Sequence, residues 1–273
     1  MKLSIITVCF NNKEGLIDTI QSIKKQSYRD FEFIIIDGGS TDGTLEIITQ
    51  YKSLFSYWVS EKDNGIYHAM NKGIIQAKGD YCLFLNSGDY LVDENVLSNV
   101  FSVCYDEDIL YGNIIKVKGK RKRVITYSEH LTFSDFYRKE PVIHHQAAFI
   151  NRELFSEFGF YRQDTHIIAD WIFFFDSILK GNVSTKYINE IISIFDATGI
   201  SNQKTKETSP NKIKDIHLKR AILELNISKL VLIDYDKFYK GTSKFKRMKT
   251  AIKWRLSSFV SMKQFIYLYK KLK

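Results

Sequence analysis

Two aspartates follow apolar runs that read as buried β-strands. Asp89 comes after the run at residues 81–85, and Asp37 comes directly after the run at residues 31–36. In open α/β sheets, ligands bind outside the carboxyl ends of the strands. A carboxylate at that edge can hold a divalent cation or contact a nucleotide. We therefore interpret both aspartates as candidate site residues, with the alternative that Asp37 only caps its own turn.

A third aspartate, Asp170, precedes the apolar run at residues 171–175. A carboxylate before an apolar helix is commonly an N-cap, because it accepts hydrogen bonds from free N–H groups. His144 and His145 lie in a predicted strand at residues 142–150, where alternation sends them to opposite faces. His145 is the better candidate for contacting a phosphate or a metal, and the alternative is a satisfied strand residue.

The elements that must position these residues alternate between strands and helices. Residues 3–10 form a short β-rich run that is followed by apolar residues at helical spacing. The glycine-rich turn at residues 37–44 leads into a predicted helix, and its glycines would let the backbone approach a ligand. An amphipathic helix then precedes the strand at residues 81–85. The pattern β-α-β-α-β-α-β predicts an α/β protein with a mostly parallel sheet flanked by helices.

Four motifs together resemble glycosyltransferase family 2. They are Val-Cys-Phe-Asn-Asn from Val8, Ile-Asp-Gly-Gly-Ser-Thr-Asp-Gly-Thr from Ile36, Asp-Asn-Gly-Ile-Tyr-His-Ala-Met-Asn-Lys-Gly from Asp63, and Leu-Asn-Ser-Gly-Asp from Leu85. The resemblance implies a GT-A fold with a Rossmann-like sheet, a nucleotide-sugar donor, Mn²⁺ or Mg²⁺, and inversion at the anomeric carbon. It implies a catalytic domain at residues 1–200, with a nucleotide-sugar-binding half at 1–115 and an acceptor-binding half at 116–200.

The resemblance also implies residue roles, with Asp170 as the general base and Asp89 as the metal ligand. The donor-binding candidates, chosen from the motifs and from the strand ends, are Thr7, Asn11, Asp37, Gly38, Asp63, Asn71, Asn86 and His145. Tyr67 and His68 are interpreted as packing or surface residues.

Two motif positions depart from the family pattern. Gly38 stands where members commonly carry a second acid that meets the nucleotide base, and we take this to favour a UDP-sugar over a GDP-sugar. The segment that usually holds an Asp-x-Asp metal motif begins here with Asn86, so Asp89 is its only acid. Phosphate oxygens and water would then complete the shell of a hard cation.

Composition and charge favour a protein with one large core and a basic tail. The chain has 273 residues, of which 44% are hydrophobic. Its three cysteines are an odd number, which favours a reducing compartment over a disulfide framework. Since no signal peptide and no run of roughly 20 apolar residues is found, a cytoplasmic location is expected. Residues 1–203 carry 21 Lys and Arg against 26 Asp and Glu, whereas residues 204–273 carry 19 against 5.

Residues 201–210 are the predicted linker, and residues 211–273 are predicted to form a basic amphipathic helical extension. Its apolar face would either dock on the catalytic domain or attach peripherally to an anionic membrane at the inner face of the plasma membrane. Both outcomes are compatible with the sequence.

The functional prediction is an inverting, metal-dependent glycosyltransferase that acts on a glycan or lipid-linked acceptor in surface polysaccharide biosynthesis. One alternative is a nucleic-acid-binding protein that uses the basic tail. However, the aromatic residues fall within apolar stripes, so no stacking platform is predicted and no nucleic acid is expected as a partner. The other alternative is a sugar nucleotidyltransferase, which would usually carry a Gly-rich, Arg- or Lys-bearing phosphate loop after the first strand. Residues 10–15 do not supply such a loop.

Overall fold

The computed structural model describes residues 1–136, 141–197, 215–216, 219 and 222. The chain divides into two compact units, Met1–Lys219 and Arg220–Lys273. The first unit therefore extends past the predicted linker at 201–210, which itself lies outside the described residues. So does most of the predicted extension at 211–273. Within the described part of the chain, no helix is both long and apolar enough to cross a membrane.

The first half of the first unit is the predicted β-α-β-α-β-α-β arrangement. Its four strands pair in the order β3-β2-β1-β4, and all three pairings are parallel. Every residue of β1 is buried, as expected for a strand covered on both faces. The elements are β1 (Leu3–Cys9), α1 (Lys13–Lys24), β2 (Phe31–Asp37), α2 (Thr44–Gln50), the 3₁₀ turn η1 (Lys52–Leu54), β3 (Tyr57–Ser60), α3 (Ile66–Gln76) and β4 (Tyr81–Phe84).

The second half extends the same sheet in the order β8-β6-β9-β5, with β7 paired to β6. β8 is antiparallel to both β4 and β6, whereas β6 and β9 run parallel. β6 and β7 pair antiparallel and form a hairpin with basic residues around 118–123. The elements are β5 (Tyr90–Leu91), α4 (Val96–Val100), β6 (Ile109–Lys118), β7 (Arg121–Ile125), α5 (Phe133–Phe136), η2 (His145–Ala147), β8 (Ala148–Asn151), α6 (Leu154–Glu157), α7 (Ala169–Phe174), the π-helical η3 (Phe175–Lys180) and β9 (Thr185–Asp196).

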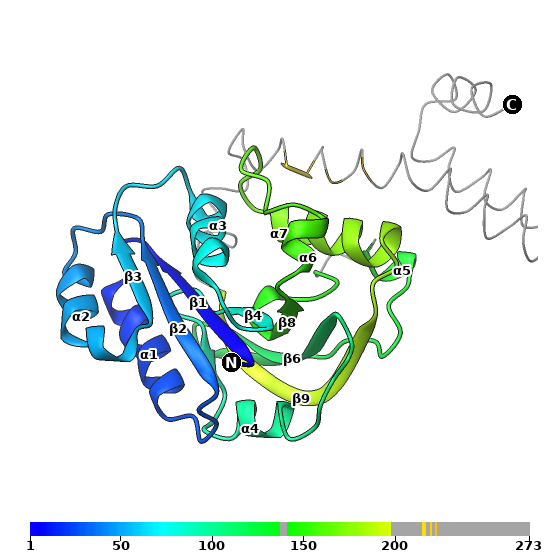
Figure 1. The fold of residues 1–273 in the computed structure, drawn as a ribbon, viewed down its shortest axis with the longest axis horizontal. Coiled ribbons are helices and arrows are strands. Elements are labelled where there is room, and N and C mark those ends of the chain that lie inside the picture. The colour runs from blue at the N-terminus through cyan, green and yellow to red at the C-terminus, as the bar shows by residue number, and fades with distance from the viewer. Residues whose placement is uncertain (137–140, 198–214, 217–218, 220–221, 223–273) are drawn as a thin grey trace, which may run out of the picture. The chain divides into compact units, whose positions relative to one another are not determined.

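Helices cover both faces of the sheet. Figure 1 shows α1 and α4 on one side and α3, α6 and α7 on the other. The α3 helix packs very closely on β1, since a Cβ atom at Gly73 would lie 2.4 Å from Cγ2 of Ile6. A glycine is therefore required at this position of α3, and the close packing brings the N-terminus of α3 toward the carboxyl ends of the strands.

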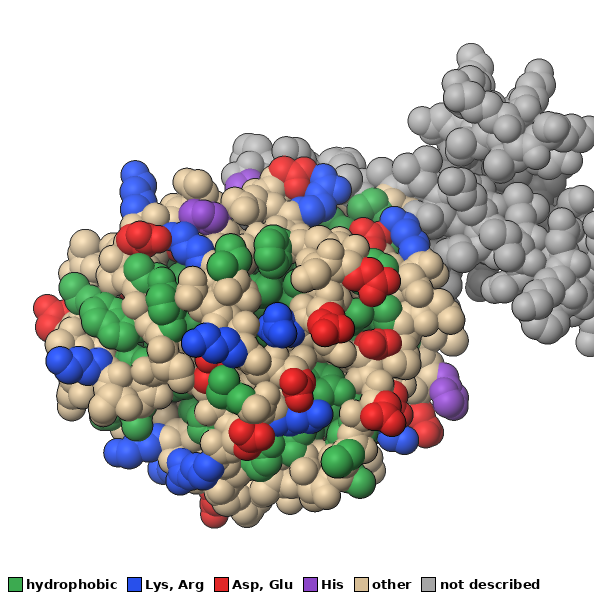
Figure 2. Space-filling model, viewed as in Figure 1, with side chains coloured by type: hydrophobic (Ala, Val, Ile, Leu, Met, Phe, Trp, Pro, Cys, Tyr) green, Lys and Arg blue, Asp and Glu red, His purple; other side chains and the backbone are tan. Residues whose placement is uncertain are grey.

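The described surface carries charges of both signs. On the face drawn in Figure 2, Lys and Arg side chains lie interspersed with Asp and Glu side chains. This face of the described residues lacks the broad single-sign patch that steers nucleic acid to a protein.

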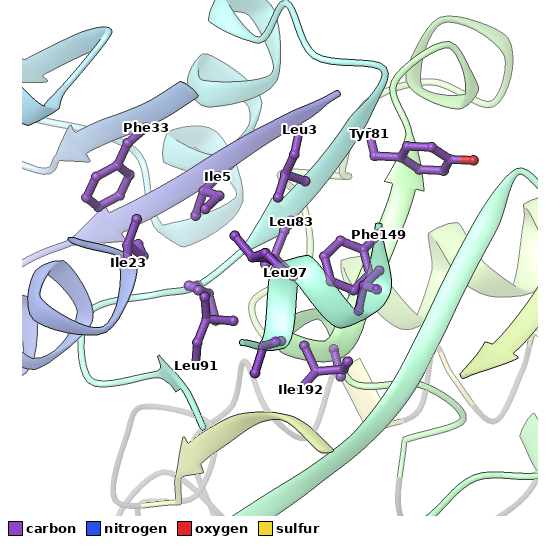
Figure 3. Packing of buried hydrophobic residues seen from close by; sticks show 14 of the residues in the cluster. Leu3, Ile5, Ile23, Phe33, Tyr81, Leu83, Leu91, Leu97, Phe149 and Ile192 are labelled. Atoms are coloured by element: carbon purple, nitrogen blue, oxygen red, sulfur yellow. The ribbon is translucent and has the colours of Figure 1, made fainter. Parts of the chain in front are cut away.

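The largest core cluster lies between the sheet and helices α1 and α4. Figure 3 shows Leu3, Ile5 and Leu83 of the sheet packed with Leu97 of α4. All four side chains are fully buried. Burying side chains of this kind contributes roughly 1.5–3 kcal/mol each. The core therefore holds β1 and β4 rigidly, and the polar side chains at their carboxyl ends are presented by fixed strands.

The predicted strand at residues 142–150 is wrong in its first half. The strand β8 begins only at Ala148, and His145 opens the short 3₁₀ turn η2. This turn is closed by a hydrogen bond from the N–H of Ala147 to the carbonyl of His144, at 3.0 Å. The 3₁₀ turn, and not strand alternation, therefore orients His144 and His145.

Candidate active site

Three of the predicted site residues form one hydrogen-bonded chain. Asn86 follows β4, and its Nδ2 lies 3.1 Å from Nε2 of His145 in η2. The other ring nitrogen of that histidine, Nδ1, lies 2.9 Å from Oδ2 of Asp170 in the first turn of α7. Residues from three separate segments of the sequence thus meet beyond the carboxyl end of β4. This is the region where ligands bind in an open α/β sheet.

The geometry selects one tautomer for the neutral form of His145. The Asp170 carboxylate can only accept, so Nδ1 of His145 carries the proton that it donates. Nε2 then accepts from the Asn86 amide nitrogen, which leaves the amide oxygen Oδ1 of Asn86 facing away from the imidazole. That oxygen is buried and has no hydrogen-bond partner among the described residues. A phosphate oxygen cannot donate to it, so its natural partners are a cation or a sugar hydroxyl.

Asp170 is held by further hydrogen bonds and remains partly open. Its Oδ1 accepts from the hydroxyl of Tyr67 at 3.2 Å and from the backbone N–H of Trp171 at 2.8 Å. Burial by itself would raise the pKa of Asp170. The hydrogen bond and charge of His145, together with the other two donors, lower this pKa below the ordinary value. With 18% of its side chain exposed, Asp170 is an ionised carboxylate that an acceptor hydroxyl can reach.

Asp89 is buried, although it lies beyond the end of β4. Only 5% of the residue is exposed, and its Oδ2 accepts from Nε2 of Gln146 at 3.1 Å. Burial raises the pKa of Asp89 to about 7, and the charge of His145 and the Gln146 hydrogen bond oppose that rise. The cause of its burial is the packing of residues 86–89 against η2 and the end of β9, which the sequence did not reveal.

Asp89 and Asn86 supply the kind of ligands that Mn²⁺ or Mg²⁺ requires. Both offer hard oxygen atoms on the same turn, and the Asn86 oxygen lacks any other partner among the described residues. Within that part of the chain, no group of three or more His, Cys, Asp or Glu side chains could hold a metal by itself. Because Mg²⁺ is usually held by one or two carboxylates plus substrate phosphates, the residues present fit such an ion.

Asp37 and Thr7 are enclosed by protein in this structure. Asp37 is fully buried, and its Oδ2 accepts from the hydroxyl of Ser60 at 2.6 Å and from the backbone N–H of Ser40 at 3.0 Å. Its Oδ1 accepts from the Ser40 hydroxyl at 2.5 Å. Thr7 is fully buried in β1, and its hydroxyl has no hydrogen-bond partner among the described residues. The contacts predicted between these two residues and the donor stay predictions, and Asp37 also caps the turn after β2.

Gly38 and Asp63 lie against each other, although 25 positions separate them. A Cβ atom at Gly38 would lie 2.5 Å from Oδ2 of Asp63, so the carboxylate occupies the space beside the glycine. Oδ1 of Asp63 accepts from the backbone N–H of Gly65 at 2.7 Å. The neighbouring Asn11 is exposed and has a φ of 48°, and its Oδ1 accepts from the N–H of Thr41 at 2.8 Å. Asn11 thereby joins the loop after β1 to the turn after β2.

Asn71 supports the loop at Tyr161. Its amide clamps the backbone of Tyr161, with Nδ2 donating to the carbonyl at 2.8 Å and Oδ1 accepting from the N–H at 3.0 Å. Tyr67, interpreted from the sequence as packing or surface, was missed as a partner of Asp170. A signal was present, because Tyr67 and Asn71 are four positions apart and share one helical face. Two polar groups on a buried face need partners.

The comparisons with known proteins agree with this geometry. The family model described as "Glycosyl transferase family 2" matches residues 4–159. The chain belongs to glycosyl transferase family 2. An uncharacterized glycosyltransferase of Mycobacterium tuberculosis is 32% identical over 214 residues, covering 74% of this chain and 78% of that protein. A PGL/p-HBAD biosynthesis glycosyltransferase of Mycobacterium bovis is 28% identical over 263 residues, covering 92% and 96%.

Solved structures show the same fold at low sequence identity. Staphylococcus aureus TarS 1–349 in complex with UDP-GlcNAc has a TM-score of 0.67 at 19% identity, covering 83% of this chain and 66% of that one. The mannosyltransferase PcManGT from Pyrobaculum calidifontis, in complex with GDP-Man and Mn²⁺, has a TM-score of 0.55 at 15% identity and covers 97% and 82%. The predicted GT-A fold is confirmed. The nucleic-acid-binding and nucleotidyltransferase alternatives are not supported.

The family match ends before Asp170, which lies in α7 beyond residue 159. The assignment of the base therefore depends on the geometry around Asp170 rather than on the match itself. Asn86, His145 and Asp89 are among the matched residues. The hydrogen bond between His145 and Asp170 therefore joins the matched region to helix α7, which lies outside the match.

Proposed function

We propose that this glycosyltransferase transfers a sugar from a nucleotide diphosphate to an acceptor hydroxyl with inversion, and that Asp170 is the general base. The observation that carries the proposal is the chain Asn86–His145–Asp170 at the carboxyl end of β4. It joins a partly exposed, ionised carboxylate to an amide whose free oxygen has no protein partner among the described residues.

Asp170 has the properties that a base in this reaction needs. The acceptor hydroxyl loses its proton as it attacks the anomeric carbon, and a carboxylate within hydrogen-bond reach can take that proton. His145, Tyr67 and the N–H of Trp171 hold both carboxylate oxygens, which fixes the direction in which Asp170 points. A single displacement on the face opposite the leaving diphosphate inverts the anomeric configuration, and no covalent intermediate with the protein is needed.

The donor would lie along the turns that follow β2 and β4. Asp63 places a carboxylate oxygen beside Gly38, in the space that a side chain at position 38 would otherwise fill. We assign to Asp63 the contact with the nucleotide base that the second acid of the family pattern would make. A uracil ring has one N–H group, and a carboxylate can accept a hydrogen bond from it. This contact is compatible with a UDP-sugar. TarS, with bound UDP-GlcNAc, supports UDP, whereas PcManGT binds GDP-Man.

Asp89 and the amide oxygen of Asn86 would hold the divalent cation. When bound, Mn²⁺ or Mg²⁺ neutralises the negative charge that develops on the leaving diphosphate. Gln146 orients Asp89 through its hydrogen bond, and His145 orients Asn86. The two residues of η2 therefore support the two oxygen ligands, which explains why this turn replaces the expected strand.

The acceptor is proposed to be a glycan or a lipid-linked intermediate of a surface polysaccharide. The biosynthetic role of the Mycobacterium bovis relative supports an acceptor of this broad kind. Peripheral attachment at the inner face of the plasma membrane through residues 211–273 remains a prediction from their basic, amphipathic sequence.

The test of the base is Asp170→Asn. Asparagine keeps the shape of the side chain and can still accept the Tyr67 and Trp171 hydrogen bonds, but it cannot take a proton. We expect sugar transfer from a labelled nucleotide sugar to a membrane extract to fall by roughly 10²- to 10⁴-fold. Donor affinity, measured by calorimetry, should stay within a few-fold of the wild-type value. Transfer that survives nearly unchanged would show that Asp170 is only a helix cap.

A further inference from the structure

A residue far along the chain, Asp215, contacts the segment that presents the base. Asp215 is fully buried, and its Oδ2 accepts from the backbone N–H groups of both His166 and Ile167, each at 2.7 Å. These two residues immediately precede α7, whose first turn carries Asp170. The other oxygen of Asp215 is buried and has no hydrogen-bond partner among the described residues. The carboxylate of Asp215 therefore holds the backbone just before α7 in place.

Lys219, four residues after Asp215, contacts the same segment. Its ammonium nitrogen lies 4.8 Å from the centre of the Trp171 ring, which is the residue after Asp170. Burial lowers the pKa of Lys219, and the negative charge of Asp170 opposes that shift. Residues four apart lie on one face of a helix. Asp215 and Lys219 therefore contact the two ends of residues 166–171 from a single helical face.

Trp171 of α7 is itself part of a layer of packed aromatic side chains. Its ring stacks on Phe175 with centroids 5.2 Å apart and meets the edge of Phe136 at 6.1 Å. The cation of Lys219 covers this layer next to Asp170. A cation over the face of an indole ring is attracted to it. Asp215 thus holds the backbone before Asp170, Lys219 contacts the side chain after it, and both residues lie outside the family match at 4–159.

We propose that Asp215 and Lys219 are positioning residues for the general base. Asp215 fixes the backbone before α7, and Lys219 fixes Trp171 after Asp170, so the carboxylate keeps its direction toward the acceptor hydroxyl. The inference rests on the proposed function of Asp170. It also gives the first residues of the C-terminal extension a part in catalysis, whereas the sequence indicated only docking or membrane attachment for that extension.

The principal test compares Asp215→Ala with Asp215→Asn in the full-length protein. Alanine removes the acceptor of two N–H groups, and we expect kcat for transfer to fall by roughly 10- to 100-fold, because small misplacements of a catalytic group have effects of this size. Asparagine retains an oxygen that can accept both N–H groups, so it should restore most of the activity. The donor dissociation constant should not change in either variant. Ile216→Ala, at an adjacent and exposed position, is the matched control and should behave as the wild type.

A second pair of variants keeps the proposal falsifiable if Asp215→Ala does not fold. Lys219→Met retains the apolar stem but loses the cation over Trp171, and kcat should fall several-fold with unchanged donor affinity. Lys219→Arg should restore it. Wild-type kcat in Lys219→Met and in any folded Asp215→Ala, or a parallel loss of donor affinity in either, would overturn the proposal. If Asp170→Asn abolishes transfer while these variants do not affect it, only this inference fails. If Asp170→Asn leaves transfer intact, the proposed function fails first.

Discussion

The two adjacent histidines at the start of η2, His144 before it and His145 within it, have different roles. His145 bridges Asn86 and Asp170 through its two ring nitrogens. His144 is turned into the core, where its Nδ1 is hydrogen-bonded to the hydroxyl of Tyr127. Burial is the main reason that the pKa of His144 falls to about 3, with smaller contributions from the charges of His145 and Lys116. His144 is therefore a neutral packing residue, and only its neighbour contacts the site.

A neutral buried histidine makes folding sensitive to acid. The unfolded chain binds a proton to His144 near pH 6.5, whereas the folded protein binds it only near pH 3. The stability contributed by His144 is therefore complete above pH 6.5 and is lost as the pH falls toward 3. Between pH 7 and pH 5 we expect the wild type to lose about 2 kcal/mol relative to His144→Gln, which cannot titrate. Urea unfolding at both pH values measures this difference.

A difference between wild type and His144→Gln that stays constant from pH 7 to pH 5 would contradict the account.

Several site residues could be predicted from the sequence, because their positions depend on residues nearby in the chain. Asp89 and Asn86 follow a strand within one short motif, and Asp170 precedes an apolar helix, so their neighbours along the chain define their positions. The partners of these residues could not be predicted in the same way. Tyr67 reaches Asp170 across 103 positions, and Asp215 reaches His166 across 49. Such contacts depend on how helices pack together, which periodicity does not specify.

At the level of elements, α3 is the part that joins the donor-binding turns to the region of the base. Its first turn follows Asp63, and its buried face carries Tyr67 and Asn71. The sequence predicted this helix and the parallel strands around it, because their apolar patterns have clear periods. It did not predict the partner that Asn71 finds at Tyr161, because that loop lies 90 positions away. It also did not predict that η2 would interrupt the expected strand, since the turn depends on contacts with Asn86, Asp89 and Asp170.

Asn71→Ala tests the clamp between α3 and the loop at Tyr161. Alanine removes two buried hydrogen bonds and leaves a backbone N–H and carbonyl without partners. We expect the free energy of unfolding to fall by about 2–4 kcal/mol, measured by urea denaturation. Asn64→Ala, at an exposed position just before α3, should cost less than 0.5 kcal/mol, as surface substitutions usually do. If the two variants lost the same small amount, the clamp would not support the loop.

At the level of the whole molecule, the acidic and basic charges are separated along the chain. Residues 1–203 carry more acidic than basic side chains, while residues 204–273 carry 19 Lys and Arg against 5 Asp and Glu. The described face in Figure 2 shows both signs interspersed over the catalytic unit. The excess of positive charge therefore belongs to the extension, where the sequence predicts a membrane or docking role. Asp215 and Lys219 show that the beginning of this extension is part of the catalytic unit.

The central claim is that the turn after β4 binds a nucleotide diphosphate together with a divalent cation, and calorimetric titration of UDP with and without Mn²⁺ tests it most directly. We expect UDP to bind in the presence of Mn²⁺ and much more weakly without it. Asp89→Asn should lose the metal-dependent gain, because the amide is a poorer ligand for a hard cation than the carboxylate. Asp93→Asn, at an exposed position just after β5, should bind as the wild type does. Equal affinity of wild type and Asp89→Asn in Mn²⁺, or no binding of either UDP or GDP, would contradict the account.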